Sequence, residues 1–118
     1  MKKVITLFVF VLAVAFSGVA QQTKTVSLEQ TKGEFTQKEI KLSEGSYIFE
    51  VSNTGVGHNV GFVLAPKSNP DAHIKTAYVT EAVATGKTQK SNVTKLKKGE
   101  YVYFCPLNPT PQYTLIVE

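Results

Sequence analysis

Short runs in which apolar and polar residues alternate cover most of the chain after residue 20. In Tyr47–Ser52, the side chains of Tyr47, Phe49 and Val51 alternate with those of Ile48 and Glu50. Because successive side chains of a strand point to opposite faces, Tyr47, Phe49 and Val51 predict the buried face. Further runs rich in β-branched and aromatic residues predict strands at 23–28, 35–42, 59–64, 91–96, 101–105 and 113–117. Short strands separated by turn residues are typical of a β-sandwich.

Residues 66–90 interrupt this pattern. Ser68, Asn69, Pro70 and Asp71 supply a polar cap, an early proline and an acid, which together predict the start of a helix. We expect one or two helical turns that end near Ala77. The sequence therefore predicts an all-β protein with one short helix.

The first twenty residues have the composition of an export signal. A basic start is followed by an apolar run of 13 residues, Val4–Phe16, and by small residues that favour cleavage after Ala20. The apolar run is short for a membrane span, although an uncleaved N-terminal anchor is the alternative. We expect a signal peptide at 1–20, one domain at 21–118, a periplasmic or secreted location, and no membrane span after cleavage.

Charge and motifs exclude several classes of function. All 13 basic residues are lysines, and removal of Lys2 and Lys3 leaves 11 against nine acids, about +2. Arginine, whose planar fork recognises phosphates, is absent, so we expect no nucleic-acid partner. The chain has no nucleotide-binding loop and no paired carboxylates of a hydrolase. We therefore expect a protein that is not an enzyme.

The candidate chemistry lies at the ends of two predicted strands. Cys105, the one cysteine, follows 101–105, and His58 precedes 59–64; His73 is the one other histidine. A lone cysteine in an oxidising compartment cannot form an internal disulfide, so it is buried, metal-bound or paired with another molecule. A thiolate and an imidazole on neighbouring strand ends favour a copper site.

Three segments resemble the cupredoxin, or blue copper, family, and most closely its amicyanin and plastocyanin branch. Residues 40–53 resemble its entry strands, Gly57–Phe62 the segment with the first copper histidine, and Leu96–Cys105 the strand that delivers the copper cysteine. The resemblance implies a Greek-key β-sandwich that binds copper through His58 and Cys105. It also implies a monomer that meets a redox or copper-handling protein partner.

The resemblance breaks down in the loop after the cysteine. The shortest loop of the family has histidine three positions after the cysteine and methionine six after it, and these positions hold Asn108 and Pro111 here. The one methionine is Met1, in the predicted signal peptide. Asn108 would offer an amide oxygen, a weak donor for Cu(II). His73 would reach the site only if residues 66–77 fold over this loop, and its other interpretation is an exposed helix histidine.

Two functions remain open. One is a copper-binding protein for electron transfer or Cu(I) carriage, because a thiolate and one imidazole suit Cu(I) better than Cu(II). The other is a metal-free binding or accessory module in which Cys105 is a small buried apolar residue. Its loop end, with Val56, Leu107, Pro109 and Pro111, would then bind a partner. Thiol exchange ranks last, because it lacks a second cysteine.

Overall fold

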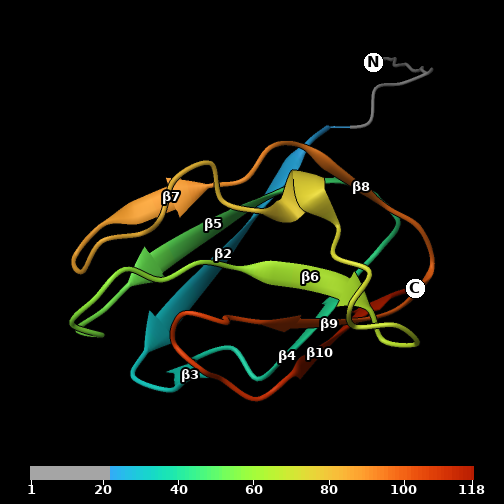
Figure 1. Ribbon diagram of the computed structural model, residues 1–118. Coiled ribbons are helices and arrows are strands. Elements are labelled where there is room, and N and C mark those ends of the chain that lie inside the picture. The colour runs from blue at the N-terminus through green and yellow to red at the C-terminus, as the bar shows by residue number, and fades with distance from the viewer. Residues whose placement is uncertain (1–21) are drawn as a thin grey trace, which may run out of the picture.

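Two β-sheets packed face to face form the part of the chain that the computed structural model describes, residues 22–118 (Figure 1). The first sheet has the order β3-β2-β5-β7, with β8 also paired to β5, and the second has the order β4-β10-β9-β6. The elements are β2 (Lys24–Thr31), β3 (Glu34–Phe35), β4 (Glu39–Leu42), β5 (Gly45–Asn53), β6 (Val63–Pro66), η2 (Lys75–Ala77), β7 (Thr88–Lys90), β8 (Thr94–Leu96), β9 (Gly99–Phe104) and β10 (Tyr113–Val117). The predicted all-β sandwich is confirmed.

The expected signal peptide at 1–20 lies outside the described residues. Within residues 22–118, no helix is long and apolar enough to cross a membrane.

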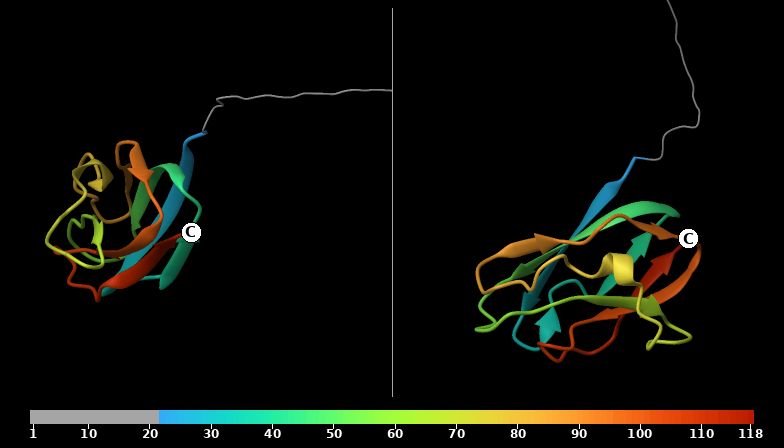
Figure 2. Two further views of the ribbon diagram at one scale, coloured as in Figure 1. Left: turned by 90° about the vertical axis from the view of Figure 1, so that its right-hand side faces the viewer. Right: turned by 45° about the horizontal axis from the view of Figure 1, so that its top comes forward.

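The strands join in a mixture of parallel and antiparallel pairs. β2 runs parallel to β5, with Lys24 opposite Tyr47, and β10 runs parallel to β4 and antiparallel to β9. The chain leaves the first sheet after β3 and enters the second at β4, so the single strand predicted at 35–42 is broken into two. Figure 2 shows the two sheets and their connections from two further sides. The break lets Phe35 enter the core while β4 pairs with the last strand.

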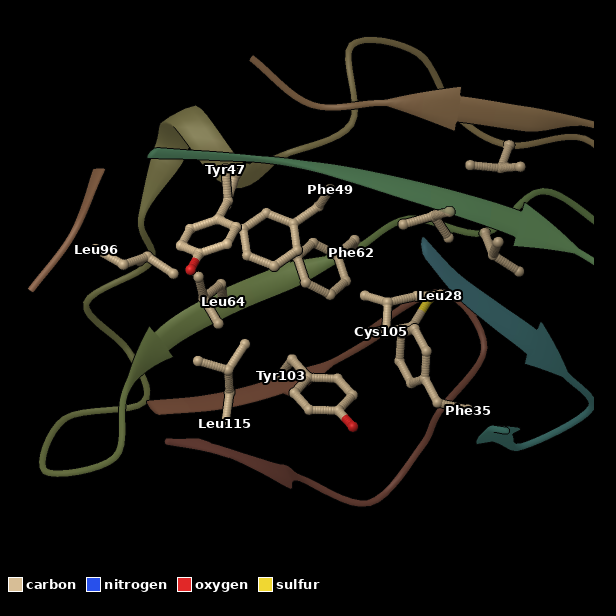
Figure 3. Close-up of a cluster of buried hydrophobic side chains, with 14 of the residues drawn as sticks. Leu28, Phe35, Tyr47, Phe49, Phe62, Leu64, Leu96, Tyr103, Cys105 and Leu115 are labelled. Atoms are coloured by element: carbon tan, nitrogen blue, oxygen red, sulfur yellow. The ribbon is translucent and has the colours of Figure 1, made fainter. Parts of the chain in front are cut away.

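Aromatic side chains fill the space between the sheets (Figure 3). The rings of Phe49 and Phe62 stack with centroids 5.1 Å apart, and Phe35 meets Tyr103 edge-on at 5.3 Å. The buried face predicted for β5 is confirmed, since Tyr47, Phe49 and Val51 are all in this cluster. Burial of each such side chain contributes about 1.5–3 kcal/mol.

The predicted helix after Ser68 is mostly absent. Residues 67–72 form turns and a bend, and the one helical piece in residues 22–118 is the 3-10 turn η2. Its first flanking residue, Ile74, makes no side-chain cap, and the Ile74 N–H donates to the carbonyl of Leu64 in β6. This bond holds the segment against the edge of the sheet, which prevents a regular α-helix there.

The strand predicted at 59–64 begins later, as β6 at Val63. In the preceding residues Val60 forms an isolated bridge with Val83. The backbone N–H and C=O of Gly61 are bonded to side chains instead of to a neighbouring strand. These two bonds belong to the candidate site.

Candidate metal centre

Cys105 comes directly after β9, on the face that points into the sandwich. Its side chain is 1% exposed and lies with Leu28 and Phe35 in the apolar cluster (Figure 3). The sulfur accepts hydrogen bonds from the backbone N–H groups of Gly61 and Asn108, each at 3.3 Å. The thiol is thus buried, and its sulfur is bonded to two separate segments.

Asn108 is also buried, with 4% of its surface exposed, and its side chain bonds to the end of β2 and to the β2–β3 connection. The amide oxygen accepts the N–H of Gly33 at 2.7 Å, and the amide nitrogen donates to the carbonyl of Thr31 at 2.8 Å. Gly33 adopts φ of 73°, a left-handed conformation that glycine tolerates. The oxygen expected to serve as a copper donor is therefore already used by a backbone amide.

Gln30, on β2, completes this arrangement. It is fully buried, and its amide nitrogen donates to the carbonyl of Gly61 at 2.6 Å. Its amide oxygen accepts from the side-chain nitrogen of Asn108 at 3.1 Å. Gln30, Gly61, Cys105 and Asn108 thus form a closed circuit of hydrogen bonds, hereafter the polar ring, that joins β2, the segment before β6 and the loop after β9.

The sequence interpretation missed Gln30 and Gly61. A usable signal exists for Gln30, because it lies two residues after Leu28 and therefore on the same, buried face of its strand. A polar amide on a buried face needs partners, which marks it as part of a hydrogen-bonded network. No comparable signal exists for Gly61, since its role depends on backbone atoms.

His58 lies outside the polar ring. Its side chain is exposed, and its Nδ1 is 2.9 Å from the carbonyl oxygen of the next residue, Asn59. The buried side chain of Asn53 donates to the carbonyl of His58 at 2.7 Å and to that of Val83 at 2.9 Å. Asn53 thereby fixes the backbone at His58, but within residues 22–118 no hydrogen bond joins the imidazole to the polar ring.

His73 is neither a helix residue nor part of the polar ring. It is half-buried, its Nδ1 is 2.8 Å from the hydroxyl of Tyr78, and its ring meets Phe104 edge-on at 6.0 Å. The interpretation of His73 as an exposed helix histidine is wrong, because His73 lies before η2, outside any helix, and is only partly exposed. Its ring faces a different part of the surface, described below.

These donors do not fit a blue copper centre. Such a centre needs a thiolate, two imidazoles and a weak axial ligand. The position of the second imidazole holds Asn108, whose oxygen is bonded to the Gly33 N–H, and the axial position holds Pro111, whose side chain has no donor atom. Within the described chain, no three residues among histidine, cysteine, aspartate and glutamate gather around one point.

Tyr103, on β9, has a pKa that is raised well above the ordinary value of a tyrosine. Its hydroxyl donates to the carbonyl of Gln37 in the connection between the sheets. Burial, with smaller contributions from the neighbouring Tyr113 and Glu39, raises the pKa of Tyr103 to about 12. The tyrosine therefore stays neutral and keeps this hydrogen bond at ordinary pH.

Comparisons with known proteins agree with the fold. The model of the family described as cupredoxin-like domain matches residues 4–117. Auracyanin A, a "blue" copper protein from the green thermophilic photosynthetic bacterium Chloroflexus aurantiacus, is 16% identical, with a TM-score of 0.58 over 82% of this chain and 100% of that chain. Amicyanin from Paracoccus versutus is 19% identical, with a TM-score of 0.51 over 80% of this chain and 81% of that chain. No curated protein matches the chain.

Proposed function

Because the chain belongs to the cupredoxin-like domain family, we propose that it is an exported, non-catalytic binding module whose ligand loop is held without a metal. The ligand loop is residues 105–112, where the family carries the copper cysteine and the ligands after it. The observation that carries the proposal is the polar ring, which supplies protein partners for the atoms that would otherwise face a metal.

The energetics of Asn108 support this proposal. Its side chain bonds to Gly33, Thr31 and Gln30 at 2.7, 2.8 and 3.1 Å. A ligand role that turned the Asn108 oxygen away from the Gly33 N–H would leave that buried group unpaired, at a cost of about 1–3 kcal/mol. A metal bound there must offset that cost with a weak amide donor.

A second candidate function is Cu(I) carriage by Cys105 and His58. The observation that favours it is the position of the sulfur, which accepts two N–H groups, one of them from Gly61, three residues after His58. A thiolate and an imidazole suit Cu(I), with Asn108 as the remaining weak donor. Similarity to the auracyanin and amicyanin structures supports copper chemistry for this candidate. Its partner would be a redox or copper-handling protein.

Copper titration separates the two functions. The protein from Gln21 to Glu118 is titrated with Cu(II), and with Cu(I) against a competing chelator, while absorption and metal stoichiometry are recorded. The proposal predicts no intense thiolate-to-copper band and no copper beyond that held by a His58→Ala, Cys105→Ser double variant. One equivalent of Cu(I) without the band supports the carrier. An intense band that Cys105→Ser abolishes contradicts the metal-free module.

Export is tested separately. We propose cleavage after Ala20, which releases the domain to the periplasm or the medium. Expression of the full chain in a bacterium with a general secretion pathway, followed by N-terminal sequencing, should give Gln21 as the first residue. Recovery of a membrane-bound protein that retains Met1 supports the uncleaved anchor instead.

A further inference from the structure

A hollow of about 380 Å³ opens on the side of the sandwich beside the edge strand β6. Residues 60–63 line one wall, His73, Tyr78, Val79 and Ala82 line another, and Pro106 and Leu107 of the ligand loop close it. The bond from the Ile74 N–H to Leu64 and the bridge between Val60 and Val83 fix the first two walls relative to each other. Two of the three walls of the hollow are therefore held in place.

The lining limits the chemistry of a ligand. Apart from His73 and Tyr78, every lining residue is apolar or glycine. Leu107 and Tyr78 leave 53% and 38% of their surface exposed at its edge. An apolar hollow disfavours a charged ligand, because desolvation of a charge is costly. Its volume lies within the range of about 300–1,000 Å³ that small-molecule sites have.

His73 supplies one directional contact. Its Nδ1 is bonded to the Tyr78 hydroxyl, and its Nε2 has no hydrogen-bond partner within residues 22–118. In a neutral imidazole one ring nitrogen donates and the other accepts, so the role of Nε2 is opposite to that of Nδ1. A hydroxyl group on a ligand can match Nε2 in either role.

We infer that this hollow is a binding site for a small, neutral molecule that is mainly apolar and carries one hydroxyl group, as phenols do. The inference names a ligand class for the binding module proposed above and rests on that proposal. None of the copper candidates, His58, Cys105 and Asn108, lines the hollow. Copper titration and ligand binding therefore report on different side chains, so failure of one is distinguishable from failure of the other.

Two small residues in the lining allow the hollow to be filled without removal of a contact. A side chain at Gly61 would meet only Leu107, at 3.8 Å, and Gly61 is not among the glycines with positive φ. Gly61→Val therefore places bulk in the hollow. Ala82→Leu does the same from the opposite wall, from an exposed position outside the polar ring. Ala84→Leu, also exposed but outside the lining, is its matched control.

The experiment uses 1-naphthol as probe, with naphthalene and 1-naphthoate as comparators, on the predicted mature protein at pH 8. Fluorescence gives the affinities, and amide chemical shifts give the location. We expect saturable binding of 1-naphthol with shifts confined to 60–63, 73–82 and 106–107. Naphthalene should bind roughly two- to ten-fold more weakly, the factor for one net hydrogen bond, and 1-naphthoate more weakly still.

Variants of the lining residues test whether 1-naphthol binds in the hollow. Ala82→Leu should reduce 1-naphthol affinity at least ten-fold while Ala84→Leu leaves it unchanged, and Gly61→Val should agree with Ala82→Leu. His73→Phe should remove the preference for 1-naphthol over naphthalene. Equal binding by Ala82→Leu and Ala84→Leu, shifts elsewhere on the protein, or no saturation up to the solubility of 1-naphthol overturns the inference.

Discussion

The apolar core and the polar ring hold the same sandwich together by different physics. Around Phe49 and Phe62 the sheets contact through rings that have no hydrogen-bonding atoms, so stability there follows buried area. In the polar ring, the buried residues Gln30, Cys105 and Asn108 and the partly buried Gly61 satisfy one another through specific donors and acceptors. A core can adjust to a lost methyl group. In a polar network, by contrast, the loss of one member leaves the remaining donors and acceptors without hydrogen-bond partners. The ring therefore specifies one position for the ligand loop.

The largest effect is expected in the core. Phe49→Ala removes a fully buried ring and leaves a cavity beside Phe62, so it should lower the free energy of unfolding by about 3–5 kcal/mol. Urea unfolding of the mature protein measures this loss. Val93→Ala, at an exposed site, should change stability by less than about 0.5 kcal/mol. A loss under 1 kcal/mol for Phe49→Ala would mean that the aromatic cluster is not the main source of stability.

Asn108→Ala should have the next largest effect. It leaves the Gly33 N–H, the Thr31 carbonyl and the Gln30 amide oxygen without their partner, and we expect a loss of roughly 3 kcal/mol. Asn92→Ala, at an exposed asparagine, is the matched control and should be nearly neutral. Equal stability of the two variants in urea would show that Asn108 does not hold the loop.

The ring also predicts coupling between residues. Gln30→Leu and Asn108→Ala each break their mutual bond, so the double variant should lose about 1 kcal/mol less stability than the sum of the single losses. A double-mutant cycle in urea measures this energy. Strict additivity would contradict a closed circuit, although each residue would still contribute alone.

A smaller effect concerns pH. The folded-state pKa of Tyr103 is raised to about 12, above the ordinary value of about 10. The unfolded chain therefore releases this proton first, so the stabilising contribution is complete below about pH 10 and is lost as pH rises toward 12. Unfolding free energies measured across that window should fall, and Tyr103→Phe should flatten the slope. An unchanged slope in Tyr103→Phe would assign the pH dependence to other groups.

The sequence correctly predicted the strands that are specified by the pattern of neighbouring residues. The alternation in Tyr47–Ser52 and the run Tyr113–Val117 correspond to β5 and β10, because the period of a strand is set by neighbouring residues. The strands predicted at 35–42 and 59–64 were broken or shortened by distant partners, such as Gln30, which bonds to Gly61. The cupredoxin fold followed from segments around His58 and Cys105 and is confirmed by the family match.

The candidate site was less predictable. Spacing placed Asn108 at the position of a ligand, but its structural partners lie 75 to 78 residues earlier in the chain. Such separations leave no periodic pattern, so the commitment of its oxygen to Gly33 was not visible in the sequence. Copper binding by His58 and Cys105 stays a prediction, and the titration above addresses it.

Hydrogen exchange in copper-free protein tests the central claim most directly. If the polar ring holds the ligand loop without a metal, the Gly61 and Asn108 amides, which donate to the Cys105 sulfur, should exchange about as slowly as amides in β9 and β10. The measurement is amide exchange by NMR in the presence of a strong chelator. Rapid exchange at both amides that becomes slow only after copper is added would contradict the account and would show that the metal, and not the ring, orders the loop.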